Sequence, residues 1–364
     1  MKVKDISSYL DTVIPISFQE SYDNCGLQVG DPENEIDAAM ISLDVTEDVM
    51  DEAITVGCEL IITHHPLIFF PIKNLTGNTY IERILLKAVK NGIAIYSSHT
   101  NLDILKAGVS RKMAEKLNLQ NIKILSPLKN RLLKLVTYIP ESHFEKVSDA
   151  IFNAGAGTIG NYDKCGFSLT GTGSFRGGEN TTPFSGEKGK FHLEKEIRFE
   201  TIMPSHIKDQ VIAALLDSHP YEEVAYDIYS LENEYKEAGL GCTCELPEPL
   251  TEKDFLLFLS TVFNAEGIRY TKFTGKKIQK VALCGGAGIS LLGDAVKAGA
   301  DAFVTSDIKY HDFFNAGNRI LLVDTGHYES EKYATEILYD LIIKKFPTFA
   351  IRFSETNTNP INYL

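Results

Sequence analysis

Histidines and carboxylates follow three apolar segments of the chain, and they are residue types that bind divalent metal ions. Two histidines stand side by side in "IITHHPLIF", an aspartate closes "SSHTNLD", and "GHYESE" holds a histidine and a glutamate four residues apart. On a helix, residues at that spacing lie on one face about one turn apart. The candidate ligands are therefore His64, His65, Asp103, His327 and Glu331. A set with two carboxylates and no thiolate suits Zn, Mn, Fe or Co.

The number of candidate ligands bears on the kind of metal site. One tetrahedral site with an open position needs fewer protein ligands than five. We therefore predict a pair of divalent ions that share a carboxylate, as in hydrolases whose metals lie about 3.5–4 Å apart. The alternative is structural, because a single buried histidine is often only a hydrogen-bonded core group. Three such clusters at strand ends favour the metal centre, since open α/β sheets bind ligands beyond the carboxyl ends of their strands.

Other polar residues could serve the same site. His99 and His311 are candidates for proton transfer, because imidazole titrates near neutral pH. Asp307 and His311, in "SDIKYH", either line the cleft or cap the next helix, and the loop "SYDNCGLQVG" (21–30) could also face the cleft. The glycines of "CGGAG" (284–288) either bind a phosphate through backbone N–H groups or form a tight strand–helix turn, which is the simpler interpretation.

Strand and helix patterns alternate on both sides of these residues. In the first third of the chain, Thr46 fits a helix N-cap, and Gly57 and Gly92 fit helix ends. The last third predicts strand, helix, strand, strand and helix in "KKIQKVALCGGAG", "LLGDAVKAGA", "DAFVTSD", "RILLVDTGH" and "ESEKYATEILYDLIIKKF". Such alternation predicts an α/β domain with a mixed, largely parallel sheet whose faces are covered by helices.

The middle of the chain has a different pattern. Residues 131–232 predict the order β-α-β-β-α-β, which is the ferredoxin-like α+β arrangement. We therefore predict a split metal-binding domain, residues 1–130 and 233–364, interrupted by this insert. The polar, glycine-rich stretch 176–190 is expected to be a loop. His219, Glu222 and Glu223 have a ligand-like spacing, although the end of a helix meeting a strand explains them more simply.

Composition narrows the classes of protein. The formal net charge of -13 argues against a general nucleic-acid-binding surface, but a bound metal could still attract a small anionic substrate. The six cysteines form no CxxC pair, and no run of 18 apolar residues occurs. We therefore expect a cytoplasmic protein with reduced thiols and no membrane segment.

Four ordered segments resemble a known family. "DNCGLQVG", "ITHHPLIF", "SSHTNLD" and "GHYESE" are similar to the signatures of the NGG-one-interacting-factor-three-like family, a dinuclear-metal family whose members are often called GTP cyclohydrolase 1 type 2 homologues. The resemblance implies the same five ligands, with Glu331 as the bridge. "HPYEEVAYDIY" (219–229) resembles the insert of the longer members, which is similar to CutA-like and PII-like domains. A homohexamer is also implied, with its metal sites facing an internal cavity.

These features lead to two hypotheses about function. The first is a metal-dependent hydrolase, in which water activated by two divalent ions attacks a polarised centre. The resemblance implies GTP as a substrate, with attack at C8 of the guanine ring. The alternative is a metal- or nucleotide-binding regulatory protein without turnover, in which the insert acts as a sensor. Cys242 stands where the family pattern has an arginine, so an anion-binding role of that arginine is not expected here.

Overall fold

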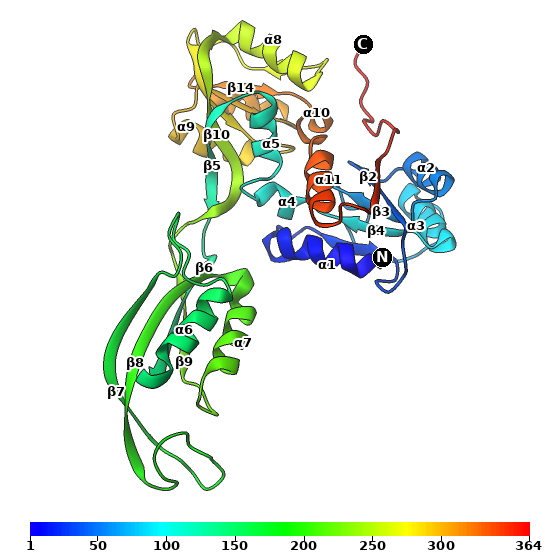
Figure 1. Ribbon diagram of the computed structural model, residues 1–364. Helices are drawn as coiled ribbons and strands as arrows, with labels where there is room; N and C mark the ends of the chain where they lie inside the picture. Colours follow the sequence, from blue (N-terminus) through cyan, green and yellow to red (C-terminus); the bar gives the residue numbers. More distant parts are fainter. The chain divides into compact units, whose positions relative to one another are not determined.

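The computed structural model describes residues 1–364, which form two compact units (Figure 1). One unit, here called the split unit, comprises Met1–Pro127 and Glu237–Leu364. The other, here called the insert, comprises Leu128–Lys236. The mixed α/β class predicted from the sequence is confirmed, but the split unit has two mixed sheets where the sequence predicted one, and the insert has an antiparallel sheet.

The first sheet of the split unit has five strands. Their order across the sheet is β1 (Gly26–Val29), β4 (Ala94–Ser97), β3 (Leu60–Thr63), β2 (Ala38–Ser42) and β15 (Ala350–Phe353). All adjacent strands are parallel except β1, which runs antiparallel to β4. Four helices pack on this sheet: α1 (Val3–Val13), α2 (Glu47–Val56), α3 (Tyr80–Asn91) and α11 (Ala334–Lys345).

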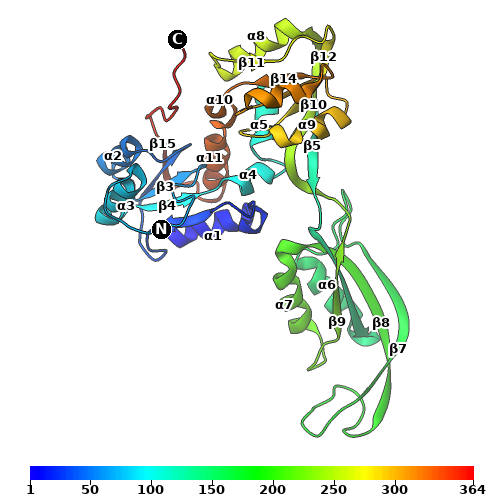
Figure 2. The same ribbon diagram turned by 180° about the vertical axis from the view of Figure 1, so that it is seen from behind.

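Helices cover both faces of this first sheet. Apolar residues of α1 and α11 share one buried cluster with strand residues such as Ile41 and Ile62. Residues of α2 and α3 share a second cluster with Ile61 and Ile95, and the two views of the ribbon agree with this arrangement (Figures 1 and 2). Burial on both faces explains why the strand sequences are continuously apolar rather than alternating.

The predicted caps of the helices are present. The side chain of Thr46 accepts a hydrogen bond from the backbone of Val49 at the start of α2. Gly57 ends α2 and Gly92 ends α3, both in the left-handed conformation at φ 73° and 68°. Each helix therefore stops where the next parallel strand must begin.

The second sheet of the split unit has six strands. Their order is β11 (Arg269–Tyr270), β14 (Leu321–Asp324), β13 (Ala302–Thr305), β12 (Lys277–Leu283), β10 (Tyr235–Thr251) and β5 (Gln120–Leu128). The three central strands β12, β13 and β14 are parallel. Helices α8 (Glu252–Phe263) and α9 (Leu292–Lys297) contribute to buried clusters that also include residues of these strands.

Strand β10 was not predicted from the sequence. It extends over 17 residues and includes glycines at 239 and 241 and prolines at 247 and 249. Glycine and proline are depleted in strands, so the local pattern gave no strand signal there. The long strand pairs with β12 through two separate stretches, with an irregularity between Glu245 and Leu250. Tertiary pairing therefore overrides the local preference of this segment.

The insert has one four-stranded antiparallel sheet and two helices. Along the chain the order is β6 (Leu132–Pro140), α6 (Phe144–Asn153), β7 (Gly166–Arg176), β8 (Phe191–Pro204), α7 (Lys208–Ser218) and β9 (Tyr226–Leu231). Across the sheet the order is β7, β8, β6 and β9, and all pairs are antiparallel. The core lies between the helices and the sheet and includes Leu135, Ile151, Phe199 and Leu215.

Short elements complete the chain. The helices are α4 (Thr100–Ile104), α5 (Val109–Lys116) and α10 (His327–Glu331), and the 3-10 helices are η1 (Ile16–Phe18), η2 (Glu141–His143), η3 (Ser205–Ile207), η4 (Ile289–Leu291) and η5 (Tyr310–Ala316). None of the helices is both long and apolar enough to cross a membrane.

Candidate metal centre

The ends of three strands of the split unit bring the predicted ligands together. His64 and His65 follow β3 directly, and Asp103 lies on the short helix α4 that follows β4. His327 begins and Glu331 ends helix α10, which follows β14. The chain places metal-type side chains where parallel strands end, which is the usual place for ligands in open α/β sheets.

The adjacent histidines reach one site because the chain turns after β3. The Thr63 hydroxyl donates a 2.7 Å hydrogen bond to the carbonyl of Leu43, and the His65 backbone N–H donates to the same carbonyl at 3.0 Å. With the strand stopped in this way, the two imidazole rings lie 5.0 Å apart between centroids, tilted by 43°. Consecutive residues of a continuing strand would have pointed to opposite faces.

One carboxylate oxygen lies at the centre of the group. Glu331 Oε2 is 2.8 Å from His65 Nε2 and 2.7 Å from His327 Nε2. The same oxygen is 3.9 Å from His64 Nε2, and that nitrogen is 3.6 Å from Asp103 Oδ1. Ligand atoms within 4.8 Å of one another form three groups: His65, His327 and Glu331; His64, Asp103 and Glu331; and His64, His65 and His99. Glu331 belongs to two of the three groups.

Two buried polar atoms, one on His64 and one on Asp103, show whether these residues suit a metal ion. His64 Nε2 and Asp103 Oδ1 are buried without any hydrogen-bond partner, although they face each other at 3.6 Å. A buried polar atom left unsatisfied costs about 1–3 kcal/mol. A nitrogen lone pair and a carboxylate oxygen that face each other would both be satisfied by one cation. The residues therefore fit a divalent metal ion.

Outer partners fix the orientation of the three ligand histidines. Each uses Nδ1 for a short contact away from the centre, which leaves Nε2 directed at the ligand group. The Nδ1 partners are Ser98 O for His64 at 2.8 Å, Asp44 Oδ1 for His65 at 2.7 Å and Asp307 Oδ2 for His327 at 2.8 Å. Such contacts set the tautomer and hold the ring of a metal-binding histidine.

The electrostatics of the cluster depend on the buried charge of Glu331. Burial raises the pKa of this carboxyl, but the hydrogen bonds from His327 and His65 outweigh burial and lower the pKa well below its usual value. Burial likewise lowers the pKa of both histidines, yet their carboxylate partners raise it to about 10 for His65 and about 9 for His327. Protons on these rings thus offset the buried charge, and metal binding would release them.

The pKa values of His64 and Asp103 are shifted in the opposite directions to those of the other two histidines and of Glu331. Burial lowers the pKa of His64 to about 3, so this ring stays neutral and keeps its lone pair. Burial and the charge of Glu331 raise the pKa of Asp103 well above its usual value. The negative charge of Glu331 is therefore stabilised by His65 and His327, whereas a charged Asp103 needs a further cation.

His99 belongs to the site through Asp23, which lies in the loop before β1; Gly26–Val29 of the predicted 21–30 loop form the strand β1 itself. Its Nδ1 lies 2.9 Å from Asp23 Oδ1, and its ring centroid lies 5.3 Å from that of His64 and 5.4 Å from that of His65. Asp23 also accepts the backbone N–H of Thr100 at 3.0 Å, so the loop is anchored to the start of α4. The side chain of Asp23 is itself fully buried and acts on the site through His99, so the prediction that polar groups of this loop face the cleft is not confirmed for it.

The structure does not bring His311 into this group. It lies exposed on η5, where its ring contacts Tyr310 and Phe314 at centroid distances of 5.1 Å and 6.3 Å. Asp307, in contrast, contacts the ligand His327, and the residue that precedes η5 is Lys309. Of the two alternatives for Asp307, the structure therefore supports the cleft and not the helix cap.

Three residues that hold the candidate ligands in place were not predicted from the sequence, namely Asp44, Ser98 and Thr358. Asp44 contacts His65 and accepts a 2.9 Å hydrogen bond from the hydroxyl of Thr358. It lies just beyond the end of β2, so the strand-end rule that identified His64 could have found it as well. Ser98 acts through its backbone carbonyl and Thr358 lies near the C-terminus, so neither gave a signal.

A cavity of about 370 Å³ lies beside the ligand group. It is lined by Leu43, Asp44, His65, Pro66, Phe69, His99, His327, Tyr328, Asn359, Pro360 and Ile361. The C-terminal segment is held there by the Asn359 amide, which donates to Glu329 at 3.0 Å. The wall of the cavity thus combines His65, His327 and His99 with apolar and aromatic side chains.

Gly286 of "CGGAG" makes space for Glu331, and the glycines of this segment do not form a phosphate cradle. Their backbone N–H groups are already used: those of Gly285, Gly286 and Gly288 donate to the hydroxyls of Ser110, Ser330 and Thr305. Gly286 has φ 60°, and a Cβ atom there would lie 1.9 Å from Glu331 Oε1. The tight-turn interpretation is therefore correct.

Fold and site define a mixed α/β protein with a cluster of histidines and carboxylates that could hold metal ions. Residues 1–360 match the Duf34/NIF3 (NGG1p interacting factor 3) family, so the chain belongs to this family and the predicted resemblance is confirmed. It is 39% identical over 360 residues to the GTP cyclohydrolase 1 type 2 homolog of Bacillus subtilis (strain 168), covering 96% of this chain and 95% of that one.

Other relatives support the same assignment. The GTP cyclohydrolase 1 type 2 homolog of Staphylococcus epidermidis (strain ATCC 12228 / FDA PCI 1200) is 34% identical over 371 residues, covering 100% of both chains. Among solved structures, the Bacillus cereus protein related to NIF3 is similar with a TM-score of 0.87 and 36% identity, covering 100% of this chain and 99% of that chain.

The contact between Gly286 and Glu331 leads to a prediction. The substitution Gly286→Ala should weaken metal binding about 10–100-fold, because the added methyl group displaces the central carboxylate. The affinity is measured by competition with a chromophoric chelator. The matched control is Gly299→Ala, which has a similar φ of 72° but open space around the added atom. Equal affinities for the two variants would contradict the proposed role of Gly286.

Proposed function

We propose that this chain is a metal-dependent hydrolase that holds two divalent ions per subunit. The observation that supports this most is that one carboxylate, Glu331, belongs to two groups of ligand atoms. His65 and His327 complete one group, and His64 and Asp103 complete the other. In this proposal Glu331 would help to hold both ions, since it belongs to both groups. Zn, Mn, Fe and Co are all compatible with these donors.

The ions and the protein side chains have different roles in this proposal. When bound, a pair of divalent ions supplies a Lewis acid and an activated water for hydrolysis. The protein holds the ligands in place through Asp44 and Asp307, whose carboxylates fix the rings of His65 and His327. Phe69 and Tyr328 contribute aromatic rings to the wall of the adjacent cavity.

His99 is the side chain that we propose moves the proton. It lines the cavity, and its Nδ1 is held by Asp23, so Nε2 is the nitrogen available to a substrate. A histidine oriented by a carboxylate is a common general acid or base. Because His311 lies exposed and outside the cavity, the proton-transfer role is assigned to His99 alone.

GTP is the first substrate to test. The relatives named above are called GTP cyclohydrolase 1 type 2 homologs, and the family resemblance implies attack at C8 of the guanine ring. The cavity volume of about 370 Å³ falls within the range of small-molecule sites. Apolar and aromatic side chains beside the histidines suit a flat ring that carries hydrolysable C–N bonds. Other C–N bonds and phosphoesters are further candidates.

A second candidate function is ligand sensing without turnover. The observation in its favour is a separate cavity of about 470 Å³ within the insert. In this alternative the insert, with a fold that we expect to be of the CutA-like or PII-like kind, binds a regulatory molecule. The metal ions would then be structural or would take part in ligand binding without consuming the ligand.

Metal content and turnover test the hydrolase proposal together. Elemental analysis should find about two divalent ions per chain after reloading with Zn or Mn, and fewer in Glu331→Gln. GTP hydrolysis, followed by chromatography of the products, should fall at least about 100-fold in this variant. The matched control is Glu336→Gln on α11, since Glu336 pairs with Lys112 and Lys116 and belongs to no ligand group and to no wall of the cavity.

Each outcome of that experiment decides between the candidates. A metal ratio near zero after reloading would contradict the metal centre itself. A ratio of two without hydrolysis of GTP, related nucleotides or phosphoesters would favour the sensing function. Equal rates for Glu331→Gln and wild type would rule out a catalytic role for the centre.

The role of His99 leads to a separate prediction. His99→Asn should lower kcat about 100–10,000-fold while the metal content stays unchanged, because the variant loses only the proton-transferring nitrogen. Asp23→Asn should have a smaller effect on kcat, since the imidazole remains. Should the metal content of His99→Asn fall instead, His99 would be a ligand, as its membership of the third group allows.

The assembly is a further proposal, based on the family resemblance. We expect a homohexamer with metal sites facing an internal cavity. Light scattering coupled to size-exclusion chromatography should then give a mass of about six times 40.4 kDa. A monomeric or dimeric mass would remove this part of the proposal and leave the metal centre unaffected, since all of its ligands come from one chain.

A further inference from the structure

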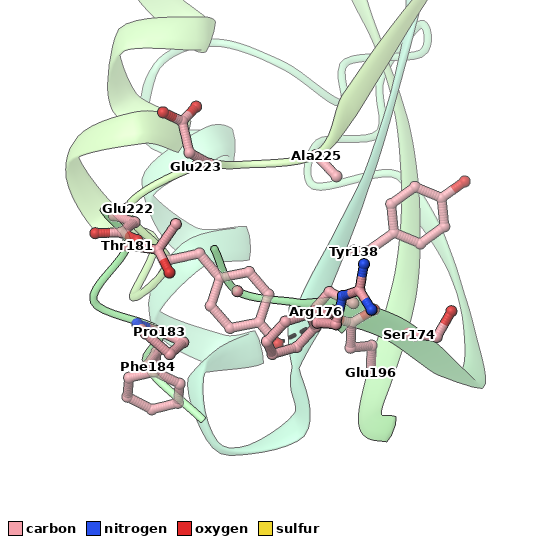
Figure 3. A pocket seen from close by; sticks show the side chains of 14 residues that line it. Tyr138, Ser174, Arg176, Thr181, Pro183, Phe184, Glu196, Glu222, Glu223 and Ala225 are labelled. Carbon is pink, nitrogen blue, oxygen red and sulfur yellow. Dashed lines mark hydrogen bonds between the residues drawn. The ribbon is translucent and has the colours of Figure 1, made fainter. Parts of the chain in front are cut away.

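The insert contains a second cavity whose residues lie between 138 and 225 of the chain, away in sequence from all metal ligands (Figure 3). Its volume is about 470 Å³, which is within the usual range for small-molecule sites. It is lined by Tyr138, Gly173, Ser174, Phe175, Arg176, Gly177, Thr181, Pro183, Phe184, Glu196, Tyr221, Glu222, Glu223 and Ala225. Nothing in the proposed hydrolase mechanism uses these residues.

Aromatic rings form much of the cavity wall. The ring of Tyr221 lies 6.2 Å from that of Phe175 and 6.0 Å from that of Phe184, and both pairs are tilted rather than stacked. Tyr138 adds a fourth ring to the lining. The faces of such rings attract cations, and several rings around one cavity are the usual arrangement for binding ammonium groups.

A buried carboxylate lies among these rings. Glu196 is only 8% exposed, and its single hydrogen-bonding partner is the Tyr221 hydroxyl, which donates to Oε1 at 2.8 Å (Figure 3). No lysine, arginine or histidine forms an ion pair with it, although buried charges in proteins are normally paired. The carboxylate therefore lacks the cation that its surroundings call for.

The backbone makes space for this carboxylate. A Cβ atom on Gly173 would lie 2.0 Å from Glu196 Oε2, so only glycine permits the observed position of the side chain. The opposite wall is the loop between β7 and β8, which is held where the Thr182 N–H donates to Glu222 at 2.7 Å. Figure 3 shows Thr181, Pro183 and Phe184 of this loop on the side of the cavity away from Tyr138 and Ser174.

The balance of charge in the lining favours a cation. The lining includes three acidic residues, Glu196, Glu222 and Glu223, and one basic residue, Arg176. Arg176 is exposed and forms no ion pair with the acidic residues. Glu196 is the buried acidic residue of this set, whereas Glu222 and Glu223 are exposed. A positive group of a ligand that contacts Glu196 would therefore be desolvated.

We propose that this cavity binds a small organic cation, an ammonium or amidinium group carried on a flat or apolar body. The charged group contacts the Glu196 carboxylate between the aromatic rings. The apolar body lies against Phe175 and Phe184, under the loop that connects β7 and β8. This site is independent of the metal centre and of the proposed hydrolase activity.

Titration calorimetry on the full-length chain tests the proposal with three probes of one shape. Benzamidine is cationic, benzamide neutral and benzoate anionic. Benzamidine should bind once per chain and at least about tenfold more tightly than benzamide, because it adds a charge-assisted contact to Glu196. Benzoate should not bind detectably. Equal affinity for the cation and the neutral probe would overturn the proposal.

One variant and its control show whether benzamidine binds at Glu196. Glu196→Gln keeps the shape of the side chain and should remove the preference for benzamidine over benzamide. Its control is Glu200→Gln on the same strand, because Glu200 pairs with Lys134 and does not line the cavity. Benzamidine binding that is unchanged in Glu196→Gln, or benzoate binding that depends on Arg176, would overturn the proposal.

A second variant keeps the test decisive if Glu196→Gln fails to fold. Phe184 is 49% exposed on the loop, so Phe184→Leu should leave the core of the insert intact. It removes one aromatic face but retains apolar volume. Benzamidine affinity should fall at least about threefold while benzamide affinity stays the same. An equal loss for both probes would show apolar packing only and would contradict the aromatic recognition of a cation.

Discussion

The contact between Glu331 and the histidines is the interaction on which the split unit depends. The carboxylate is 3% exposed, and its Oε2 lies within 2.8 Å of His65 Nε2 and 2.7 Å of His327 Nε2. His65 comes from the first part of the chain and Glu331 from the last, on either side of the insert. A buried charge that joins two distant segments is stable only when its partners are in place. The strands that hold these partners are therefore constrained by the site as well as by their own packing.

Much of the fold and most of the site could be predicted from the sequence, for a definite physical reason. Parallel strands that are buried on both faces are short and continuously apolar, so they stand out, and polar residues directly after them lie at one edge of a sheet. This reasoning identified His64, Asp103 and Glu331 without knowledge of the sheet order. The caps at Thr46 and Gly57 were predictable because local hydrogen bonds and a positive φ demand particular residues.

The features that were missed depend on contacts between distant segments. Strand β10 contains glycines and prolines, and pairing with β12 holds it extended against its local preference. Thr358 contacts Asp44 from more than 300 positions along the chain. Gly286 was recognised as part of a turn, but its closeness to Glu331 follows from the arrangement of β12 and α10. A local pattern carries no information about such tertiary distances.

The metal centre and the insert cavity both place a buried carboxylate against a glycine, but they differ in how the negative charge of that carboxylate is balanced. In each, a buried carboxylate lies against a glycine whose Cβ would come within 1.9 Å at Gly286 or 2.0 Å at Gly173. Around Glu331 the histidines supply protons that offset the charge, so the cluster is stable before a metal binds and exchanges protons for it. Around Glu196 the partner is the neutral hydroxyl of Tyr221, which cannot offset a charge. The same argument therefore assigns a metal to the first carboxylate and an organic cation to the second, because aromatic rings offer no ligand atoms to a metal but attract a diffuse positive charge.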